Sequence, residues 1–252
     1  MIRWCSYCQG FLGEIAPFDD PTFTHGLCEP CFARLERDEP LIEETAPVRG
    51  LMQQILANAT QGDDAACAAL IADARTLGLA TESLLVGLLQ PALYQAGLDW
   101  QETRMSVASE HRFTSWCERV FHMLEPTPRA PLPVDILLLQ APGNAHTLGV
   151  RFAGRVLTER GFHVETVSTG VPFEEIVSMA RALRPRFIAQ SCTMTSHVST
   201  AVALAGRLRT RIEPELRCRY VLGGFAFRLG GGGAPPAIPD VEVALDLNFF
   251  KS

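Results

Sequence analysis

The second half of the chain alternates apolar strand-like runs with amphipathic helical runs, and this alternation constrains the fold more than any other feature. The strand-like runs are VDILLLQ, FHVETVS, FIAQS, YVLGG and VEVALDL. The helical runs between them are LGVRFAGRVLTERG, FEEIVSMARALR and HVSTAVALAGRLRTR. Strands that are apolar almost throughout indicate burial on both faces, which is typical of a parallel sheet covered by helices. Residues 134–252 are therefore predicted to form an α/β domain with a parallel sheet.

Polar and glycine residues follow three of these strand-like runs. His146 lies on the loop APGNAHTLG after the first run, Ser191 ends the third, and Gly223–Gly224 ends the fourth. Ligands of such sheets bind outside the carboxyl ends of the strands, so these residues are expected to converge on one edge. A lone loop histidine can also be a plain solvated residue, and His122, His163 and His197 are interpreted as structural or exposed.

A helical segment precedes the α/β domain. Residues 44–125 contain four runs rich in Ala, Leu, Gln and Glu, with apolar residues at i, i+3, i+4 and i+7, which predicts a bundle of four or five helices. Gly78 and Gly97 are expected to stop helices, and Thr81 is expected to cap one. The stretch EPTPRAPLPVD at residues 125–135 carries four prolines and predicts a stiff linker at a domain boundary.

Two Cys-x-x-Cys pairs lie in residues 1–36, and 19 residues separate them. This spacing is typical of a tetrahedral four-cysteine zinc site, so residues 1–36 are predicted to form a zinc-ribbon-like module whose metal supplies folding energy. Iron in the same site, or redox-active thiols, are the alternatives. The predicted ligands are Cys5, Cys8, Cys28 and Cys31.

Composition limits the possible partners. The chain has 252 residues, 47% of them hydrophobic, and a net charge of -6, which argues against a broad basic face for direct nucleic-acid binding. No apolar run is long enough for a membrane span, and the N-terminus lacks the apolar core of a signal peptide. A cytoplasmic protein is expected, in which clustered cysteines favour metal over disulfides.

Residues 134–252 resemble the Rossmann-like (flavodoxin-like) cobalamin-binding domain of methionine synthase, corrinoid methyltransferase subunits and cobalamin-dependent regulators. That family carries Asp-x-His-x-x-Gly, then Ser-x-Leu or Ser-x-Thr, then Gly-Gly, in a βα-repeat. The matching residues, in the same order, are Asn144, His146, Gly149, Ser191, Thr193, Gly223 and Gly224.

The resemblance implies that cobalamin binds with its benzimidazole tail off the metal and His146 as the lower cobalt ligand. Ser191 and Thr193 would then offer hydroxyls to the tail, while the three glycines would give room to the corrin and the nucleotide. Asn144 replaces the family's Asp. An amide accepts a hydrogen bond from the imidazole without a full charge, so a more labile histidine–cobalt bond is expected.

The helical segment resembles the cap that covers the upper face of the corrin in the same families. Trp100 is followed nine residues later by Glu110 and His111, a pattern similar to that of adenosylcobalamin-binding light-sensing regulators. There the tryptophan shields the upper axial group, and the other two residues line the adenosyl site. Gln101 stands where some of these sensors have a histidine that captures cobalt after photolysis.

The first hypothesis is accordingly a cobalamin-binding sensory regulator rather than an enzyme. It would respond to light through the cobalt–carbon bond of adenosylcobalamin, or to redox state or corrinoid supply. It would signal through a regulatory partner protein or through its own oligomer. The alternative is the corrinoid methyl carrier of a methyltransferase system. A third hypothesis is a haem or other tetrapyrrole sensor, since His146 could ligate iron.

Overall fold

The computed structural model describes residues 1–37, 45–58, 63–124, 133–213, 215–228 and 240–250. The chain divides into two compact units, Met1–Pro126 and Thr127–Ser252. Most of the expected proline linker, residues 125–132, lies outside the described residues, as does the glycine- and proline-rich stretch at 229–239. The expected domain limits at 1–36, 44–125 and 134–252 stay predictions.

The second unit contains a five-stranded parallel sheet. Its strands are β4 (Ile136–Gln140), β5 (Val164–Val167), β6 (Phe187–Ser191), β7 (Arg219–Gly223) and β8 (Val241–Ala244). They lie in the order β5-β4-β6-β7-β8, and every neighbouring pair is parallel. The order reverses between β4 and β6, which is the place where ligands bind in open α/β sheets. The predicted α/β fold is confirmed.

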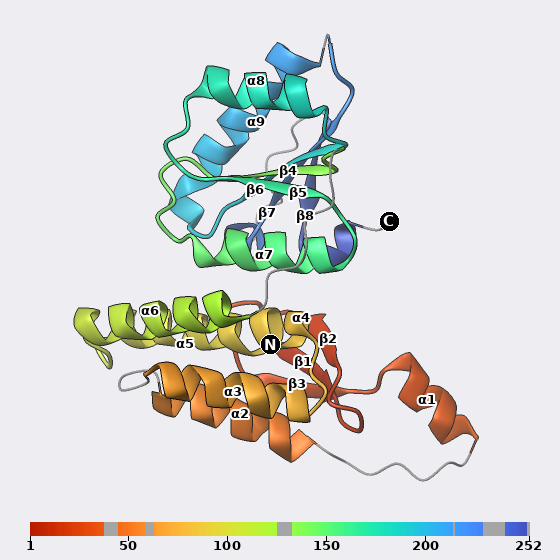
Figure 1. Ribbon diagram of the computed structural model, residues 1–252, viewed down its shortest axis with the longest axis vertical. Coiled ribbons are helices and arrows are strands. Elements are labelled where there is room, and N and C mark those ends of the chain that lie inside the picture. Colours follow the sequence, from red (N-terminus) through yellow and green to blue (C-terminus); the bar gives the residue numbers. More distant parts are fainter. Residues whose placement is uncertain (38–44, 59–62, 125–132, 214, 229–239, 251–252) are drawn as a thin grey trace. The chain divides into compact units, whose positions relative to one another are not determined.

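Helices cover both faces of this sheet (Figure 1). α8 (Phe173–Leu183) and α9 (Val198–Ile212) cover one face, and α7 (Leu148–Glu159) covers the other. Leu137 and Leu139 of β4 belong to the first core, whereas Ile136 and Leu138 belong to the second. Alternate residues of one strand therefore enter two different cores, which explains why the strand is apolar at every position.

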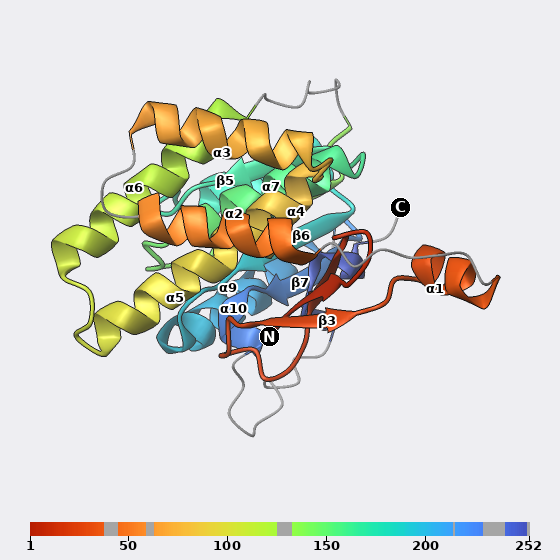
Figure 2. The same ribbon diagram turned by 90° about the horizontal axis from the view of Figure 1, so that it is seen from below.

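The first unit is built around a helical bundle. Its helices are α2 (Thr45–Asn58), α3 (Asp64–Thr76), α4 (Thr81–Leu84), a π-helical turn (Leu85–Leu89), α5 (Gln90–Gln101) and α6 (Val107–Met123). α4, the π-helical turn and α5 follow one another without a break. α2 contacts α3 and α5, and α6 also contacts both, so that four rods pack together (Figure 2). The expected helical bundle is confirmed.

A small sheet begins the same unit. β1 (Ile2–Cys5) lies between β2 (Phe11–Glu14), which is antiparallel to it, and β3 (Phe23–Gly26), which is parallel. α1 (Glu29–Glu36) follows. Trp4 is only 1% exposed, and a Cβ atom placed on Gly87 of the bundle would lie 2.6 Å from its ring. The cysteine-rich segment therefore packs on the bundle through an indole, rather than relying on metal alone.

Two expected helix boundaries differ in the structure. Gly78 follows α3 with φ +68°, as expected of a helix stop. Gly97, in contrast, lies inside α5, which runs on to Gln101. Thr81 is the first residue of α4 rather than its cap, and Ala80 occupies the cap position without a side-chain hydrogen bond.

Among the described residues, no helix has the length and apolarity that crossing a bilayer requires.

Candidate functional site

The carboxyl edge of the parallel sheet brings together residues that are far apart in sequence. Gln140 is paired with Ser191, Ser191 with Gly223, and Gly223 with Ala244. The last residues of four neighbouring strands thus form one row. The prediction that Ser191 and the Gly223–Gly224 pair meet at the edge next to the His146 loop holds in the structure.

Asn144 anchors the loop that follows β4. It is only 1% exposed, and its main-chain oxygen accepts a hydrogen bond from Gln140 Nε2 at 2.5 Å. The side-chain oxygen Oδ1 accepts from the main-chain N–H of His146 at 3.2 Å, and Nδ2 donates to Thr193 Oγ1 at 3.3 Å. The amide therefore joins this loop to the β6–α9 connection. A carboxylate at this position would have to accept from the Thr193 hydroxyl instead, so asparagine reverses the direction of this bond.

His146 is an exposed side chain next to this buried anchor. Its main chain is fixed by Asn144, while its imidazole projects from the surface of the second unit. Gly149 is the second residue of α7, and a Cβ atom there would lie 3.9 Å from Thr193 Oγ1, an ordinary contact distance. Asn144, Gly149 and Thr193 thus lie together next to the main chain of His146.

The two glycines at the end of β7, Gly223 and Gly224, have different surroundings. A Cβ atom on Gly223 would lie 3.1 Å from the carbonyl oxygen of Ala244, on the neighbouring strand. Gly224 has φ +100°, and a Cβ atom there would lie 2.5 Å from the carbonyl oxygen and 2.8 Å from the nitrogen of Cys192. The backbone of Cys192 is itself held by hydrogen bonds with Gly223 and Ala226. Gly224 is therefore required by the packing of the protein itself.

Two glutamines at this edge were not singled out from the sequence, and His197 was interpreted there only as structural or exposed. Gln140 is buried and positions the loop through Asn144. Gln190 is 3% exposed, and its Oε1 has no hydrogen-bond partner among the described residues. His197 has a buried Nδ1 that likewise lacks a partner there, and its Nε2 would lie 3.5 Å from a Cβ atom on Gly143. Glutamines that interrupt otherwise apolar strands were the available signal.

In the helical unit, Trp100, Glu110 and His111 lie at one end of the α5–α6 pair. Trp100 is 47% exposed near the end of α5. Glu110 lies in the first turn of α6, where it accepts a hydrogen bond from Thr114 Oγ1 at 2.8 Å. His111 Nε2 lies 3.7 Å from the Glu110 carboxylate, and its side chain is largely exposed. An indole that leaves half of its surface open suits a flat binding partner.

The connection between these helices is held by several hydrogen bonds. The carboxylate of Asp99 receives two hydrogen bonds from Arg104, at 2.6 and 2.9 Å. Its main-chain oxygen accepts from the N–H groups of Arg104 and Met105. Ser106 then caps α6 by accepting a hydrogen bond from the N–H of Ser109. Together these contacts fix the conformation of the loop between Trp100 and Glu110.

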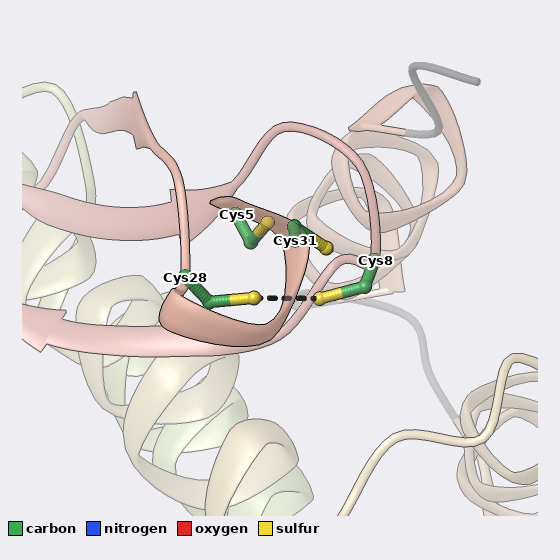
Figure 3. A group of neighbouring side chains, drawn as sticks. All are labelled: Cys5, Cys8, Cys28 and Cys31. Carbon is green, nitrogen blue, oxygen red and sulfur yellow. Dashed lines mark hydrogen bonds between the residues drawn. The ribbon is translucent and has the colours of Figure 1, made fainter. Parts of the chain in front are cut away.

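The four predicted zinc ligands form a single cluster, which Figure 3 shows. Their sulfur atoms all lie within 4.8 Å of one another, and Cys8 Sγ is 3.5 Å from Cys28 Sγ. Tetrahedral zinc–thiolate bonds of about 2.3 Å place sulfur atoms roughly 3.8 Å apart. Cys5 and Cys31 are buried, whereas Cys8 is exposed. The spacing of the sulfurs therefore fits one tetrahedral ion that can enter from solvent.

The thiols of this cluster ionise unequally. Burial opposes ionisation of Cys5, but hydrogen bonds from the backbone of Cys8, Cys28 and Tyr7 bring its pKa down to about 6. Burial, with the neighbouring thiols, raises the pKa of Cys31 to about 12. Cys8 also has a raised pKa, chiefly because of burial. The cluster thus ionises readily at one thiol and resists ionisation of a second, so a bound cation is needed for all four to become thiolates. Backbone N–H groups that point at the sulfur atoms support such ligands.

Two family models match this chain, and both describe a B12 binding domain. One matches residues 134–231, within the α/β unit. The other matches residues 51–125, within the helical unit. Together the two segments take in well over half of the chain. No curated protein matches the chain. The matches give no support to the haem hypothesis.

One solved structure supports this assignment at the level of fold. The chain resembles the monomethylamine corrinoid protein of Methanosarcina barkeri with a TM-score of 0.59 and 17% identity, over 79% of this chain and 92% of that one. A methanol:cobalamin methyltransferase complex from Methanosarcina barkeri matches with 16% identity over 80% and 82% of the two chains, at a TM-score of 0.34.

A cobalamin-binding protein from Desulfitobacterium hafniense DCB-2 matches with 13% identity over 78% and 93% of the chains, also at a TM-score of 0.34. Scores this low carry no argument about fold, so the structural likeness rests on the monomethylamine corrinoid protein. The parallel sheet, the helical bundle and both family models agree with one another. The chain therefore belongs to the B12-binding family and is a cobalamin-binding protein with a helical and an α/β B12 binding domain.

Proposed function

We propose that this protein is a regulator that senses light through bound adenosylcobalamin, with His146 as the lower cobalt ligand. Support for the lower ligand comes from the loop after β4, where an exposed imidazole stands beside a fully buried anchor. A neutral imidazole is a good donor to cobalt. Because Asn144 holds the main chain of His146, the ring can reach a metal without reorganising the loop.

The surroundings of His146 fit the rest of a corrinoid. Gln190 Oε1 and His197 Nδ1 are buried polar atoms without partners among the described residues, and such atoms are costly unless water or a ligand satisfies them. Ser191 and Thr193 offer hydroxyls at the same edge, while Gly149 and Gly223 keep it free of side chains. We assign these residues to the nucleotide tail and the corrin edge.

The upper axial group is assigned to Trp100, Glu110 and His111. The open half of the Trp100 indole offers a flat apolar surface, and Glu110 offers carboxylate oxygens to ribose hydroxyls. When bound, adenosylcobalamin supplies a cobalt–carbon bond that visible light cleaves. The role of these side chains is to shield that bond in the dark and to lose their contacts with the adenosyl group after illumination.

The observation that favours a regulator over a methyl carrier is the hydrogen bonding of Asn144. Its amide is neutral, its oxygen serves the main chain of His146, and its nitrogen donates to Thr193. A methyl carrier must pass cobalt through several oxidation states, which is helped by a charged partner that changes the basicity of the ligating imidazole. An amide tied to the protein backbone offers no such control.

The methyl carrier remains the second candidate, because a solved structure with a similar fold is a monomethylamine corrinoid protein. A carrier would bind methylcobalamin and accept reduction to the cobalt(I) state. A regulator would instead change its contacts with a partner protein or with a second copy of itself when illuminated. We place this activity in the cytoplasm, and we propose that zinc occupies the four-cysteine cluster, whose sulfur spacing supports it.

The test is absorption spectroscopy of the full chain loaded with adenosylcobalamin, in the dark and after green light, with light scattering to follow oligomeric state. We expect a photolysis spectrum together with a change in mass or in partner binding. His146→Ala should alter the dark spectrum. His163→Ala is the matched control, because His163 lies at the amino end of β5 and bonds Pro133 through its ring.

Three results would contradict the proposal. Photolysis without any change in assembly or partner binding, combined with reduction to cobalt(I) and methyl transfer, would favour the carrier. An unchanged spectrum in His146→Ala would remove His146 as the ligand. Equal spectral changes in both histidine variants would show that the effect is not specific to the loop after β4.

A further inference from the structure

The long helix of the bundle contains a π-helical turn at Leu85–Leu89, between α4 and α5. In a π-helical turn the backbone hydrogen bonds join residues i and i+5, so the turn holds one residue more than an α-helical turn. Such π-bulges are frequent at functional sites. Its central residue is Gly87, which is buried. A glycine at the middle of a buried helical turn costs helix stability, so a packing reason is expected.

That reason is the indole of Trp4. A Cβ atom on Gly87 would lie 2.6 Å from Trp4 Cζ2, 3.0 Å from Cη2 and 3.1 Å from Phe11 Cδ2. The Trp4 ring also lies 5.5 Å from the Phe11 ring and 5.9 Å from that of Phe23. β1 and β2 thus each contribute one aromatic ring to the contact with Gly87, and Phe23 of β3 packs against the Trp4 ring.

The four-cysteine cluster is covalently adjacent to this contact. Trp4 precedes Cys5 at the end of β1, and Cys8 lies on the turn that leads to β2. Cys28 and Cys31 follow β3. Three strands of four residues each are too short to hold their arrangement without help. An ion bound to all four sulfurs would tie the end of β1 to the β1–β2 turn and to the start of α1, next to the ring that fills Gly87.

The register of the π-helical turn determines where the following helix points. If the turn were to relax to α-helical geometry, the helix beyond it would rotate by about 100° and shift by about 1.5 Å. Trp100 lies near the end of that same continuous helix. A change at Gly87 would therefore alter the direction in which the exposed indole projects.

We propose that a zinc-class ion at Cys5, Cys8, Cys28 and Cys31 keeps Trp4 wedged against Gly87 and so maintains the π-helical register of the α4–α5 helix. The metal is then a second input to the protein, besides its corrinoid. Loss of the ion loosens the small sheet, withdraws the indole and releases the π-helical turn. The inference rests on the proposed zinc binding but is independent of light and of cobalamin.

The first experiment is hydrogen–deuterium exchange of the full chain without corrinoid, comparing zinc-loaded protein with protein treated with a chelator. Zinc content is measured in parallel. We expect amide exchange at Leu85–Leu89 to accelerate by about tenfold after zinc removal, because local opening sets the exchange rate. Exchange in α3 is the internal reference and should not change.

A matched pair of variants separates the wedge from the metal. Gly87→Ala introduces a methyl group where the Trp4 ring lies, whereas Gly97→Ala on the same helix has nothing within 4 Å. Both keep all four cysteines. We expect Gly87→Ala to retain zinc and yet show the faster exchange, and Gly97→Ala to behave like the original protein. Trp4→Phe, which shortens the wedge without adding bulk, should resemble Gly87→Ala.

The outcomes are distinguishable. If the protein binds no zinc at all, the metal assignment fails and the inference fails with it. If zinc binds but its removal, Gly87→Ala and Trp4→Phe all leave exchange at Leu85–Leu89 unchanged, the zinc site stands and the coupling to the helix is overturned.

Discussion

Gly224→Ala tests whether the second glycine of the Gly-Gly pair serves the protein or the cofactor. An alanine at φ +100° is strained by on the order of 1–2 kcal/mol, the range for left-handed backbone in residues other than glycine. Its methyl group would also approach the oxygen, nitrogen and carbonyl carbon of Cys192 to 2.5, 2.8 and 3.0 Å. Cys192 cannot move easily, because its N–H and its carbonyl are both hydrogen bonded.

Overpacking of this kind costs about 1–3 kcal/mol, so the total destabilisation should be roughly 2–5 kcal/mol. Domains of this size are stable by only about 5–15 kcal/mol, so the effect is large. The assay is urea unfolding of the full chain without cobalamin, followed by circular dichroism. Gly206→Ala is the control, since nothing lies within 4 Å of it in α9, and it should be neutral or slightly stabilising.

An unchanged unfolding midpoint in Gly224→Ala, together with lost cobalamin binding, would refute this reasoning. That result would mean that Cys192 yields to the methyl group and that the glycine is needed only for the nucleotide. Gly223→Ala should be milder, because the nearest atom, the carbonyl oxygen of Ala244, is 3.1 Å away and no positive φ is involved.

Three further predictions concern single contacts. Thr193→Val removes the acceptor of Asn144 Nδ2 and should destabilise the chain by about 1 kcal/mol in urea unfolding, whereas an unchanged midpoint would show that the 3.3 Å bond contributes nothing. Trp100→Ala should leave unfolding nearly unchanged, because the indole is half exposed, but should speed dark loss of the adenosyl group in absorption measurements; unaltered dark stability would place Trp100 away from the cofactor. The pKa of Glu242 is lowered, first by its hydrogen bonds with Arg219. This exposed pair adds at most about 1 kcal/mol to the free energy of unfolding, and that stability is present above the ordinary pKa range of glutamate and is lost as pH falls below it. Glu242→Gln should flatten this acid limb of the stability curve.

The fold of the α/β unit was predictable because its strands are buried on both faces. Ile136 and Leu137 enter opposite cores, so the strand is apolar throughout and ends visibly at Gln140. Parallel strands share one carboxyl edge, and the positions of Ser191 and Gly223 followed from that rule. Residues that are far apart in sequence could therefore be assigned to one site from the strand pattern alone.

Side-chain contacts were less predictable. The sequence suggested that Asn144 would serve the imidazole, but its oxygen accepts from the main chain of His146 and its nitrogen donates to Thr193. Loop conformation decides these partners, and it is set by Gln140, which looked like an ordinary strand end.

The helical unit shows where local signals fail. Gly97 was expected to stop a helix, yet tertiary packing carries α5 through it. Trp4 and Gly87 are 83 residues apart in sequence, and nothing local announces that one fills the space left by the other. Contacts of that kind depend on how a small sheet packs on a bundle, which neither periodicity nor motif spacing encodes.

The central claim is that His146 is the lower axial ligand of cobalt. Electron paramagnetic resonance of the full chain loaded with cob(II)alamin tests it directly, because an axial nitrogen splits the cobalt lines. Protein made with ordinary histidine should give three-line splitting, and protein made with histidine enriched in the spin-one-half nitrogen isotope should give two-line splitting that is lost in His146→Ala. Three-line splitting that persists in the enriched protein would show that the benzimidazole of the cofactor is still the ligand, and would contradict the account.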